Sequence, residues 1–449
     1  MQEQISIYPL GCEPFCVSGS AVWDDESHQV ELIPGPEMGV PECHHCQRRM
    51  HIHSHHLVRL RAMPVGNHIV CWWNVHYRRF VCPECGRTEY DAIPFHYVGD
   101  GTTGTKVTVE FARYVWRRLD GTSIKSVADG LHLRWGTVKS IELFYMKRIL
   151  SIAGIPRDTQ YLGIDEVHIG HNRRRHHYIT IISSLDHRRP IWVCDGKSIE
   201  DVMPFFSWYG KELLSNVKAI SMDANAGYTT AFRRGCPNAS PVLDHFHIIQ
   251  DYGRDCLGRI RIRLWHDLEE TDRKLSKKFK NSLRTSMMRE EDLSEGGLRH
   301  LQELRAASRD FDCGIVCLYL LRNVYERHSE TRDEMKRAWG HWVSVAIATG
   351  VPEIVAFAKN KNTPASRTSI LNYADHRISN GPIEGINNKV GKVLQSAYGI
   401  SDLEYLFTKI QFIFLPEKMR MFDRDWHEDA VRKPYKRKLP DNTTCGDLL

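Results

Sequence analysis

The sequence predicts a multidomain α/β protein, and three observations lead to that prediction. A chain of 449 residues is too long for one ordinary core, since domains typically hold roughly 100 to 200 residues. Two Cys-x-x-Cys pairs near the N-terminus precede a helical pattern, which is followed by a series of strand-like runs. A long helical block then interrupts the strand-containing part, so we expect an α/β domain that is split by an all-helical insertion.

The composition is typical of a soluble globular protein. Hydrophobic residues make up 42% of the chain and charged residues 26%, and no apolar run approaches the ~20 residues of a membrane span. The N-terminus lacks the basic start and the apolar core of a secretory signal, which predicts a cytoplasmic protein without a membrane segment. In a reducing compartment, thirteen cysteines with several close pairs indicate metal ligation rather than disulfides.

Charge is unevenly distributed around a net value of +6. Residues 1–42 contain eight acidic residues and no Lys or Arg, whereas residues 43–85 contain six Arg and one Glu. Residues 254–289 contain eleven basic and five acidic residues, and the C-terminal run VRKPYKRKLP is basic again. Such surfaces suit a polyanion such as DNA, and an ordinary solvated face is the alternative. Within the third stretch, we expect these residues to contact phosphates: Lys274, Lys277 and Lys278.

The most specific motif is a pair of cysteine knuckles, CHHC at 43–46 and CPEC at 82–85. Each Cys-x-x-Cys turn directs two thiolates toward one ion, so we predict a structural Zn²⁺ held by Cys43, Cys46, Cys82 and Cys85. The 35 residues between the knuckles include strand-like runs that can fold back, as in a zinc ribbon. Buried cysteines without a ligand are the alternative. Other possible ligands also lie close by in sequence: Cys12, Cys16, His44, His45, His51, His53, His55 and His56.

Helical periodicity follows between residues 107 and 150. Phe111, Val115 and Leu119 recur at spacings of four, and a short helix, a turn near 130–134 and another helix come next. This layout is that of a helix-turn-helix, and a helical hairpin used only for packing is the alternative. The last helix would present four side chains to a DNA major groove: Arg134, Trp135, Thr137 and Lys139.

Beyond residue 155 the pattern changes to strands. The runs YLGIDEVHI, HHYITIISSL and RRPIWVCDG read as an antiparallel meander, and NVKAISMD and SPVLDHFH each follow an amphipathic stretch. We therefore predict the order three strands, helix, strand, helix, strand, followed by helices. The expected domains are a zinc ribbon (1–92), a helix-turn-helix (93–155), the α/β domain (156–250), the insertion (251–374), the last helical region of the α/β domain (375–415) and a basic tail (416–449).

Three carboxylates lie at the ends of predicted elements. Asp165 and its neighbour Glu166 end an apolar strand, Asp223 follows the fourth strand, and Glu384 lies in the first turn of a helix after the insertion. A carboxylate buried at a strand needs a cation or hydrogen-bond donors nearby, and a metal, an Arg of HNRRRHH or solvent could meet that need.

Two divalent cations, roughly 4 Å apart, would use such oxygen ligands for phosphoryl transfer. Each carboxylate also has a purely structural alternative: a polar strand end, an Asx-type turn or a favourable helix-dipole contact.

The strings GIDEVHIG, ISMDANAGY, LDHFHII and SNGPIEGINNKV carry a resemblance to bacterial insertion-sequence transposases of the ISL-three type, which extends over nearly the whole chain. The resemblance implies a ribonuclease-H-like catalytic domain with an Asp-Asp-Glu triad that binds Mg²⁺ or Mn²⁺, here Asp165, Asp223 and Glu384. DHFH also resembles the Cys-or-Asp, two residues, His motif of the Mutator-like group, which makes Asp244 and His247 supporting residues. The first knuckle departs from the family's Cys-Pro-x-Cys-Gly, so the geometry at CPECG is the more secure.

The resemblance implies a DNA transposase that binds the terminal inverted repeats of its element, cleaves there and joins the ends to target DNA. We expect a homodimer or larger assembly on double-stranded DNA, associated with the bacterial nucleoid. A catalytically inactive DNA-binding regulator and a metal-dependent nuclease on the same fold are the alternatives. Of the two candidates for the second metal ligand, we favour Asp223 over Asp244, because the fourth strand is expected to lie beside the first.

Overall fold

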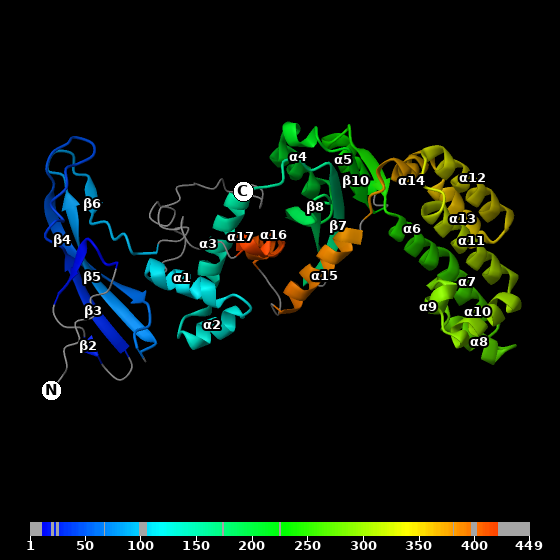
Figure 1. Cartoon of the computed structure of the whole chain (residues 1–449), viewed down its shortest axis with the longest axis horizontal. Helices are drawn as coiled ribbons and strands as arrows, with labels where there is room; N and C mark the ends of the chain where they lie inside the picture. The colour runs from blue at the N-terminus through cyan, green and yellow to red at the C-terminus, as the bar shows by residue number, and fades with distance from the viewer. Residues whose placement is uncertain are drawn as a thin grey trace. The chain divides into compact units, whose positions relative to one another are not determined.

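The computed structural model describes residues 11–18, 22–23, 27–66, 68–97, 106–172, 175–223, 226–379, 381–396 and 402–420 (Figure 1). The basic tail beyond residue 420 lies outside this range. The chain divides into two compact units, one built mainly from residues 1–153 and the other from residues 154–415. Within the described residues, no helix is both long and apolar enough to cross a membrane.

The first unit begins with a six-stranded sheet of order β1-β3-β5-β4, in which β2 pairs with β3 and β6 with β5. Its core includes Phe15, Leu32, Leu60 and Val75. The long strands β4 and β5 are antiparallel, with His51 opposite Val81. The strands are β1 (Phe15–Val17), β2 (Val22–Trp23), β3 (Ser27–Pro34), β4 (His51–Ala62), β5 (Val70–Val81) and β6 (Thr88–Tyr90).

Three helices follow the sheet and share a core of their own. Thr108 and Ser123 cap the first two, and each accepts a hydrogen bond from the backbone N–H three residues later. The buried Val115, Val127 and Val138 come from successive helices of this group, which packs as a compact bundle. The helices are α1 (Val109–Arg118), α2 (Ile124–Gly130) and α3 (Trp135–Ala153), and the short α17 (Glu417–Arg420) contacts α3.

The second unit contains a five-stranded mixed sheet of order β11-β10-β7-β8-β9. The strands β7, β8 and β9 form an antiparallel meander, and β10 and β11 join parallel to β7. The predicted order of strands and helices and the predicted place of the fourth strand beside the first are confirmed. The strands are β7 (Tyr161–Asn172), β8 (Arg175–Ser184), β9 (Arg189–Asp195), β10 (Ala219–Met222) and β11 (Ser240–Leu243).

Helices cover both faces of this sheet (Figure 1). On one face, Leu162 and Ile164 of β7 pack against α4 (Ile199–Leu214) and α5 (Ala226–Gly235). On the other, Ile179 and Ile181 of β8 pack against α15 (Gly381–Ser396) and α16 (Leu403–Ile413). The chain therefore returns to the sheet after an insertion of more than a hundred residues. Helices α15 and α16, which follow the insertion, cover the second face of the sheet.

The insertion consists of helices throughout, as predicted, and residues 244–379 are all described. Its core is large and apolar, with Tyr252, Phe311, Trp339 and Trp342 fully buried. The elements are α6 (His245–Tyr252), a π-helical turn (Gly253–Leu257), α7 (Gly258–Asp267), α8 (Arg273–Lys280), α9 (Leu283–Met287), a 3₁₀ turn (Glu290–Asp292), α10 (Glu295–Ala307), α11 (Arg309–Glu326), α12 (Arg332–Ala348), α13 (Pro352–Lys361) and α14 (Pro364–His376).

Candidate functional site

The four knuckle cysteines converge at one end of the β4–β5 pair. The antiparallel register brings the residues before β4 beside those after β5, which places both knuckles together. The sulfur atoms of Cys43 and Cys85 lie 3.6 Å apart, those of Cys46 and Cys82 3.3 Å, and those of Cys46 and Cys85 3.8 Å. All four Sγ atoms lie within 4.8 Å of one another.

Both knuckles have the same backbone turn. Gln47 N donates to Cys43 O at 2.8 Å, and Gly86 N donates to Cys82 O at 3.0 Å. Gln47 has φ 55° and Gly86 has φ 67°, so both take the left-handed conformation that follows the second cysteine. The departure of the first knuckle from the Cys-Gly pattern therefore leaves its turn unchanged, although a non-glycine residue in that conformation carries a steric cost.

The donor set fits a zinc ion. Zn–S bonds of about 2.3 Å in a tetrahedron place sulfur atoms about 3.8 Å apart, close to the observed separations. Backbone N–H donors, chiefly that of Cys85, lower the pKa of Cys82 to about 7, whereas the hydrogen bond to Cys82 raises the pKa of Cys46, so within this pair the thiolate forms first at Cys82. Within the described part of the chain, neither Cys12, Cys16 nor any of the nearby histidines joins this group.

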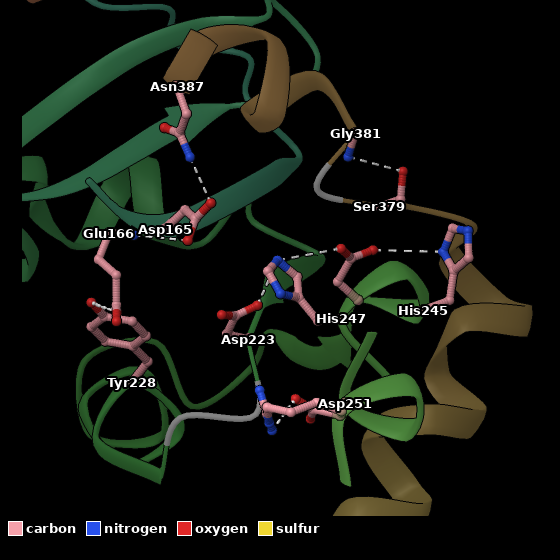
Figure 2. Close-up of polar contacts among 12 residues, drawn as sticks. Asp165, Glu166, Asp223, Tyr228, His245, His247, Asp251, Ser379, Gly381 and Asn387 are labelled. Atoms are coloured by element: carbon pink, nitrogen blue, oxygen red, sulfur yellow. Dashed lines mark hydrogen bonds and ion pairs between the residues drawn. The ribbon is translucent and has the colours of Figure 1, made fainter. Parts of the chain in front are cut away.

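A second group of ligand-type side chains lies at the ends of the parallel strands in the second unit. Ala219 of β10 pairs with Tyr161 of β7, so the same register places Asp223 level with Asp165. Met222 pairs with Leu243 of β11, which places Asp244 on the same level. The side chains of Asp165 and Asp223, together with His247 of α6, offer ligand atoms within 4.8 Å of one another (Figure 2).

Asp165 is held by two hydrogen bonds. Its Oδ1 accepts from the backbone N–H of Glu166 at 2.8 Å, and its Oδ2 accepts from Asn387 Nδ2 at 2.7 Å. Burial and the nearby negative charge of Asp223 raise the pKa of Asp165 to about 6. Two carboxylates this close need positive charge between them, which a divalent cation provides.

His247 supplies positive charge to this group in the structure. Its Nε2 lies 2.7 Å from Asp223 Oδ1 and 3.8 Å from Asp244 Oδ2. The contact with Asp223 is the main cause that raises the pKa of His247 to about 9. An imidazole is also a metal ligand when neutral, so two carboxylates and this ring form a donor set that could hold a divalent cation.

The side chain of Asp244 is more deeply buried than those of Asp223 and His247. Its side chain is 1% exposed and lies 3.6 Å from Nδ1 of His245, whose ring packs against Tyr325 and Tyr373. Burial lowers the pKa of His245. Asp244 thus lies between the carboxylate group and the helical insertion, and it is not among the three residues whose ligand atoms converge.

Glu384 is not part of the converging group either. Its side chain is exposed on α15, one turn before Asn387, which makes the contact with Asp165. The helix is fixed to β7 at Gly163, where an added Cβ would lie 2.2 Å from Ile383 Cδ1. Gly163, two residues before Asp165, thus leaves room for the side chain of Ile383.

Glu166 lies on the opposite face of β7 from Asp165, because successive strand residues alternate. Its Oε2 accepts a hydrogen bond from Tyr228 at 2.8 Å, and its Oε1 lies 3.2 Å from Lys197 Nζ (Figure 2). The two adjacent carboxylates therefore have different partners. Arg173 and Arg174, considered above as partners, lie outside the described residues, as does the side chain of Arg175.

The four side chains predicted to face a major groove lie at the start of α3. Trp135 is 52% exposed and Arg134 is exposed, whereas Val138 beneath them is buried. Lys139 Nζ lies 5.3 Å from the centroid of the Trp135 ring. Thr137 is partly exposed, so these residues form a polar and aromatic surface over an apolar anchor.

The three predicted lysines of the insertion lie on α8. Lys274 and Lys277 are exposed, whereas Lys278 forms an ion pair with Glu303. Phe279 on the same helix is fully buried and holds it to the insertion core. Their predicted contact with phosphates stays a prediction, and the sequence pattern did not reveal the partner of Lys278, which lies 25 residues away.

Three contacts at the carboxylate group were not predicted from the sequence. Asn387, Tyr228 and Lys197 each contact one of the two adjacent carboxylates. A usable signal existed for Asn387, since it lies four residues after Ile383 and so shares a helix face with it. Tyr228 follows Asp223 by five residues, but nothing local indicates that its hydroxyl reaches β7.

Comparisons with known proteins agree with this arrangement. The ISL3-type DDE family model, described as a transposase, matches residues 162–410. The transposase for insertion sequence element IS1001 of Bordetella parapertussis is 25% identical over 398 residues, which cover 87% of this chain and 93% of that protein. The transposase for insertion sequence element IS1557 of Mycobacterium tuberculosis is 25% identical over 347 residues, or 72% of this chain and 73% of that protein.

Proposed function

The chain belongs to the ISL3 family of insertion-sequence transposases, and on that basis we propose that it binds the terminal inverted repeats of its own element, cleaves DNA there and joins the ends to target DNA. The convergence of Asp165, Asp223 and His247 at the ends of two parallel strands is the observation that carries the proposal. The strand order, with a meander followed by two parallel strands, supports a ribonuclease-H-like catalytic domain.

The proposed catalytic triad is Asp165, Asp223 and Glu384. These carboxylates would hold divalent metal ions, whose positive charge would activate a nucleophile and stabilise the leaving oxygen of a phosphodiester. Asp165 and Asp223 would hold the ions, and Asn387 orients the Asp165 carboxylate. Glu384 is exposed on α15, one turn before the residue that contacts Asp165, and we propose it as the third carboxylate of the triad.

Asp244 and His247 are proposed as supporting residues. Asp244 lies 3.8 Å from the ring nitrogen of His247 that contacts Asp223, and it would support that ring by its charge. In its protonated form the ring balances the charge of the two carboxylates before metal binds. As a neutral ring, it either ligates an ion or accepts a proton near the reacting phosphate.

The remaining parts of the chain are proposed to bind DNA. The zinc ribbon (1–92) and the helix-turn-helix (93–155) supply sequence recognition, with Arg134, Trp135, Thr137 and Lys139 at the base edges. Lys274 and Lys277 of the insertion contact phosphates. Two ends must be held together for joining, which favours a dimer or larger assembly that acts at the nucleoid.

Cleavage and joining of repeat DNA test the proposal. Purified protein with Mg²⁺ and labelled DNA that carries the repeats flanking its gene should yield nicked ends and then strand-transfer products. Cleavage without joined products would favour a nuclease. If the parent protein binds the repeats but does not cleave them, and its binding equals that of Asp165→Asn, the result would favour a DNA-binding regulator.

A further inference from the structure

The spacing between Asp165 and Asp223 is not fixed by the strand ladder alone. The parallel pairing of β7 with β10 ends at Ser221 opposite Gly163, two residues before the carboxylates. Beyond that pair the two segments carry the Asp165 and Asp223 carboxylates, which repel each other except where His247 balances their charge. A metal site with the correct spacing therefore needs another contact that holds these segments together.

A hydrogen bond between Tyr228 and Glu166 makes such a contact. Tyr228 lies five residues after Asp223, at the start of α5, and its hydroxyl donates to Glu166 Oε2 at 2.8 Å. Glu166 directly follows Asp165. The bond thus joins the residue after one carboxylate to the helix that follows the other, and it does so on the opposite face of the sheet (Figure 2).

Neighbouring groups hold both partners in place. The Tyr228 side chain is fully buried in the core under α4 and α5, and its hydroxyl also lies 3.2 Å from Thr180 Oγ1. Thr180 lies opposite Glu166 on β8 and donates to Gly196 O at 2.7 Å. Lys197 Nζ, 3.2 Å from Glu166, also lies 4.0 Å from the centroid of the Tyr178 ring. Because both of its partners have further contacts, the Tyr228–Glu166 hydrogen bond can resist the repulsion between the Asp165 and Asp223 carboxylates.

We propose that Tyr228 and Glu166 are positioning residues, whose hydrogen bond sets the separation of Asp165 and Asp223 and so the affinity of the site for divalent metal. The inference rests on the proposed function, because it takes these two carboxylates as metal ligands. Glu166 does not itself ligate metal in this account, since its carboxylate lies on the opposite face of the sheet from Asp165.

Direct Mn²⁺ binding to the zinc-loaded, full-length protein, measured by calorimetry, tests the proposal. Tyr228→Phe should raise the Kd for Mn²⁺ about 10-fold, the lower end of the loss for a direct partner of a metal ligand, because Tyr228 acts through the residue next to the ligand. Tyr209→Phe is the matched control. Tyr209 is buried in the same core and its hydroxyl donates to Pro156 O, away from both carboxylates. The control should leave the Kd unchanged.

Variants of Glu166 separate a positioning role from direct ligation. Glu166→Gln retains an oxygen that accepts the tyrosine hydrogen bond, so its Kd should stay near that of the parent, whereas Glu166→Ala should match Tyr228→Phe. High Mn²⁺ should restore cleavage by Tyr228→Phe, because only metal affinity is affected. This restoration would not occur if the variant were merely unfolded.

Three results would overturn the inference. Equal Kd values for Tyr228→Phe and Tyr209→Phe would remove the positioning role. A loss in Glu166→Gln as large as that in Glu166→Ala, with Tyr228→Phe unaffected, would make Glu166 a direct ligand. If Asp165→Asn binds Mn²⁺ as tightly as the parent, the metal site itself is misplaced, and the proposed function fails together with the inference.

Discussion

The side-chain amide of Asn387 donates a 2.7 Å hydrogen bond to Oδ2 of Asp165, across 222 positions of sequence. The contact fixes α15 beside β7 and orients the Asp165 carboxylate. It also locates the acidic residue of the same helix, because Glu384 lies one turn earlier on α15. The helix that completes the sheet layer therefore carries the orienting amide and, one turn earlier, an exposed carboxylate.

Glu384→Gln should abolish DNA cleavage, by at least about 100-fold, because it removes charge that the proposed metal site needs. Binding to repeat DNA should not change, since Glu384 lies far in sequence from the proposed reading residues. Glu200→Gln is a suitable control, because Glu200 is also an exposed first-turn glutamate, on a helix of the opposite face of the sheet. Equal cleavage by the two variants would exclude Glu384 from the triad.

The order of elements was predictable because strand and helix periods differ strongly in this sequence. The runs around Asp165, Ile181 and Val193 alternate or are continuously apolar, and β-branched residues are frequent in them. The place of β10 beside β7 followed from the expected topology and brought Asp223 level with Asp165.

The contacts that orient the carboxylates were not predictable in the same way. The bonds from Asn387 and Tyr228 join segments 222 and 62 residues apart, and they depend on how helices pack on the sheet rather than on local pattern. Sequence spacing likewise could not show that Glu384 stays exposed. At the zinc knuckles, the departure of the first from Cys-Pro-x-Cys-Gly made its geometry less secure than that of CPECG, yet the backbone at Gln47 matches that at Gly86.

The cysteine cluster predicts one zinc ion per chain. Cys82→Ser combined with Cys85→Ser should remove it and unfold the end of the β4–β5 pair, because a structural zinc site contributes directly to folding. Metal analysis of the purified full-length protein measures the loss. Cys12→Ser with Cys16→Ser is the control, because these cysteines lie outside the cluster. Zinc retained in the first variant and lost in the second would show that the ligands are different.

Repeat recognition should depend on the start of α3. Arg134→Ala and Lys139→Ala should each weaken repeat binding by about 1–3 kcal/mol and relax sequence preference, if these side chains contact base edges. Lys147→Ala, about three turns further along the same helix, should have little effect on sequence preference. Competition binding with repeat and scrambled DNA gives both quantities. A uniform loss for both DNAs would indicate phosphate contacts only.

The lysines of α8 should contribute affinity without specificity. Lys274→Ala with Lys277→Ala should lower the affinity for all DNA sequences and reduce the salt dependence by about two units of slope, one per lost phosphate contact. Lys278→Ala should change the slope less, since its ammonium group is already paired with Glu303. An unchanged slope in the double variant would mean that this face is only solvated.

Asp223 is favoured over Asp244 as the second metal ligand by its position relative to His247. The ring nitrogen lies 2.7 Å from Asp223 and 3.8 Å from Asp244, and only Asp223 joins Asp165 within the converging group. Asp244 is instead almost fully buried beside His245. We therefore expect Asp244→Asn to impair cleavage by about 10- to 100-fold, as loss of a supporting group does, rather than to abolish it.

Metal-dependent cleavage by cysteine variants tests the central claim most directly. Asp165→Cys and Asp223→Cys should cleave repeat DNA at least about 100-fold more slowly than the parent with Mg²⁺, and recover activity with Mn²⁺, because thiolate ligands disfavour a hard ion such as Mg²⁺. Asp244→Cys should show the same deficit with both metals. Recovery with Mn²⁺ in Asp244→Cys, without recovery in Asp223→Cys, would contradict the assignment of Asp165 and Asp223 as the metal-binding pair.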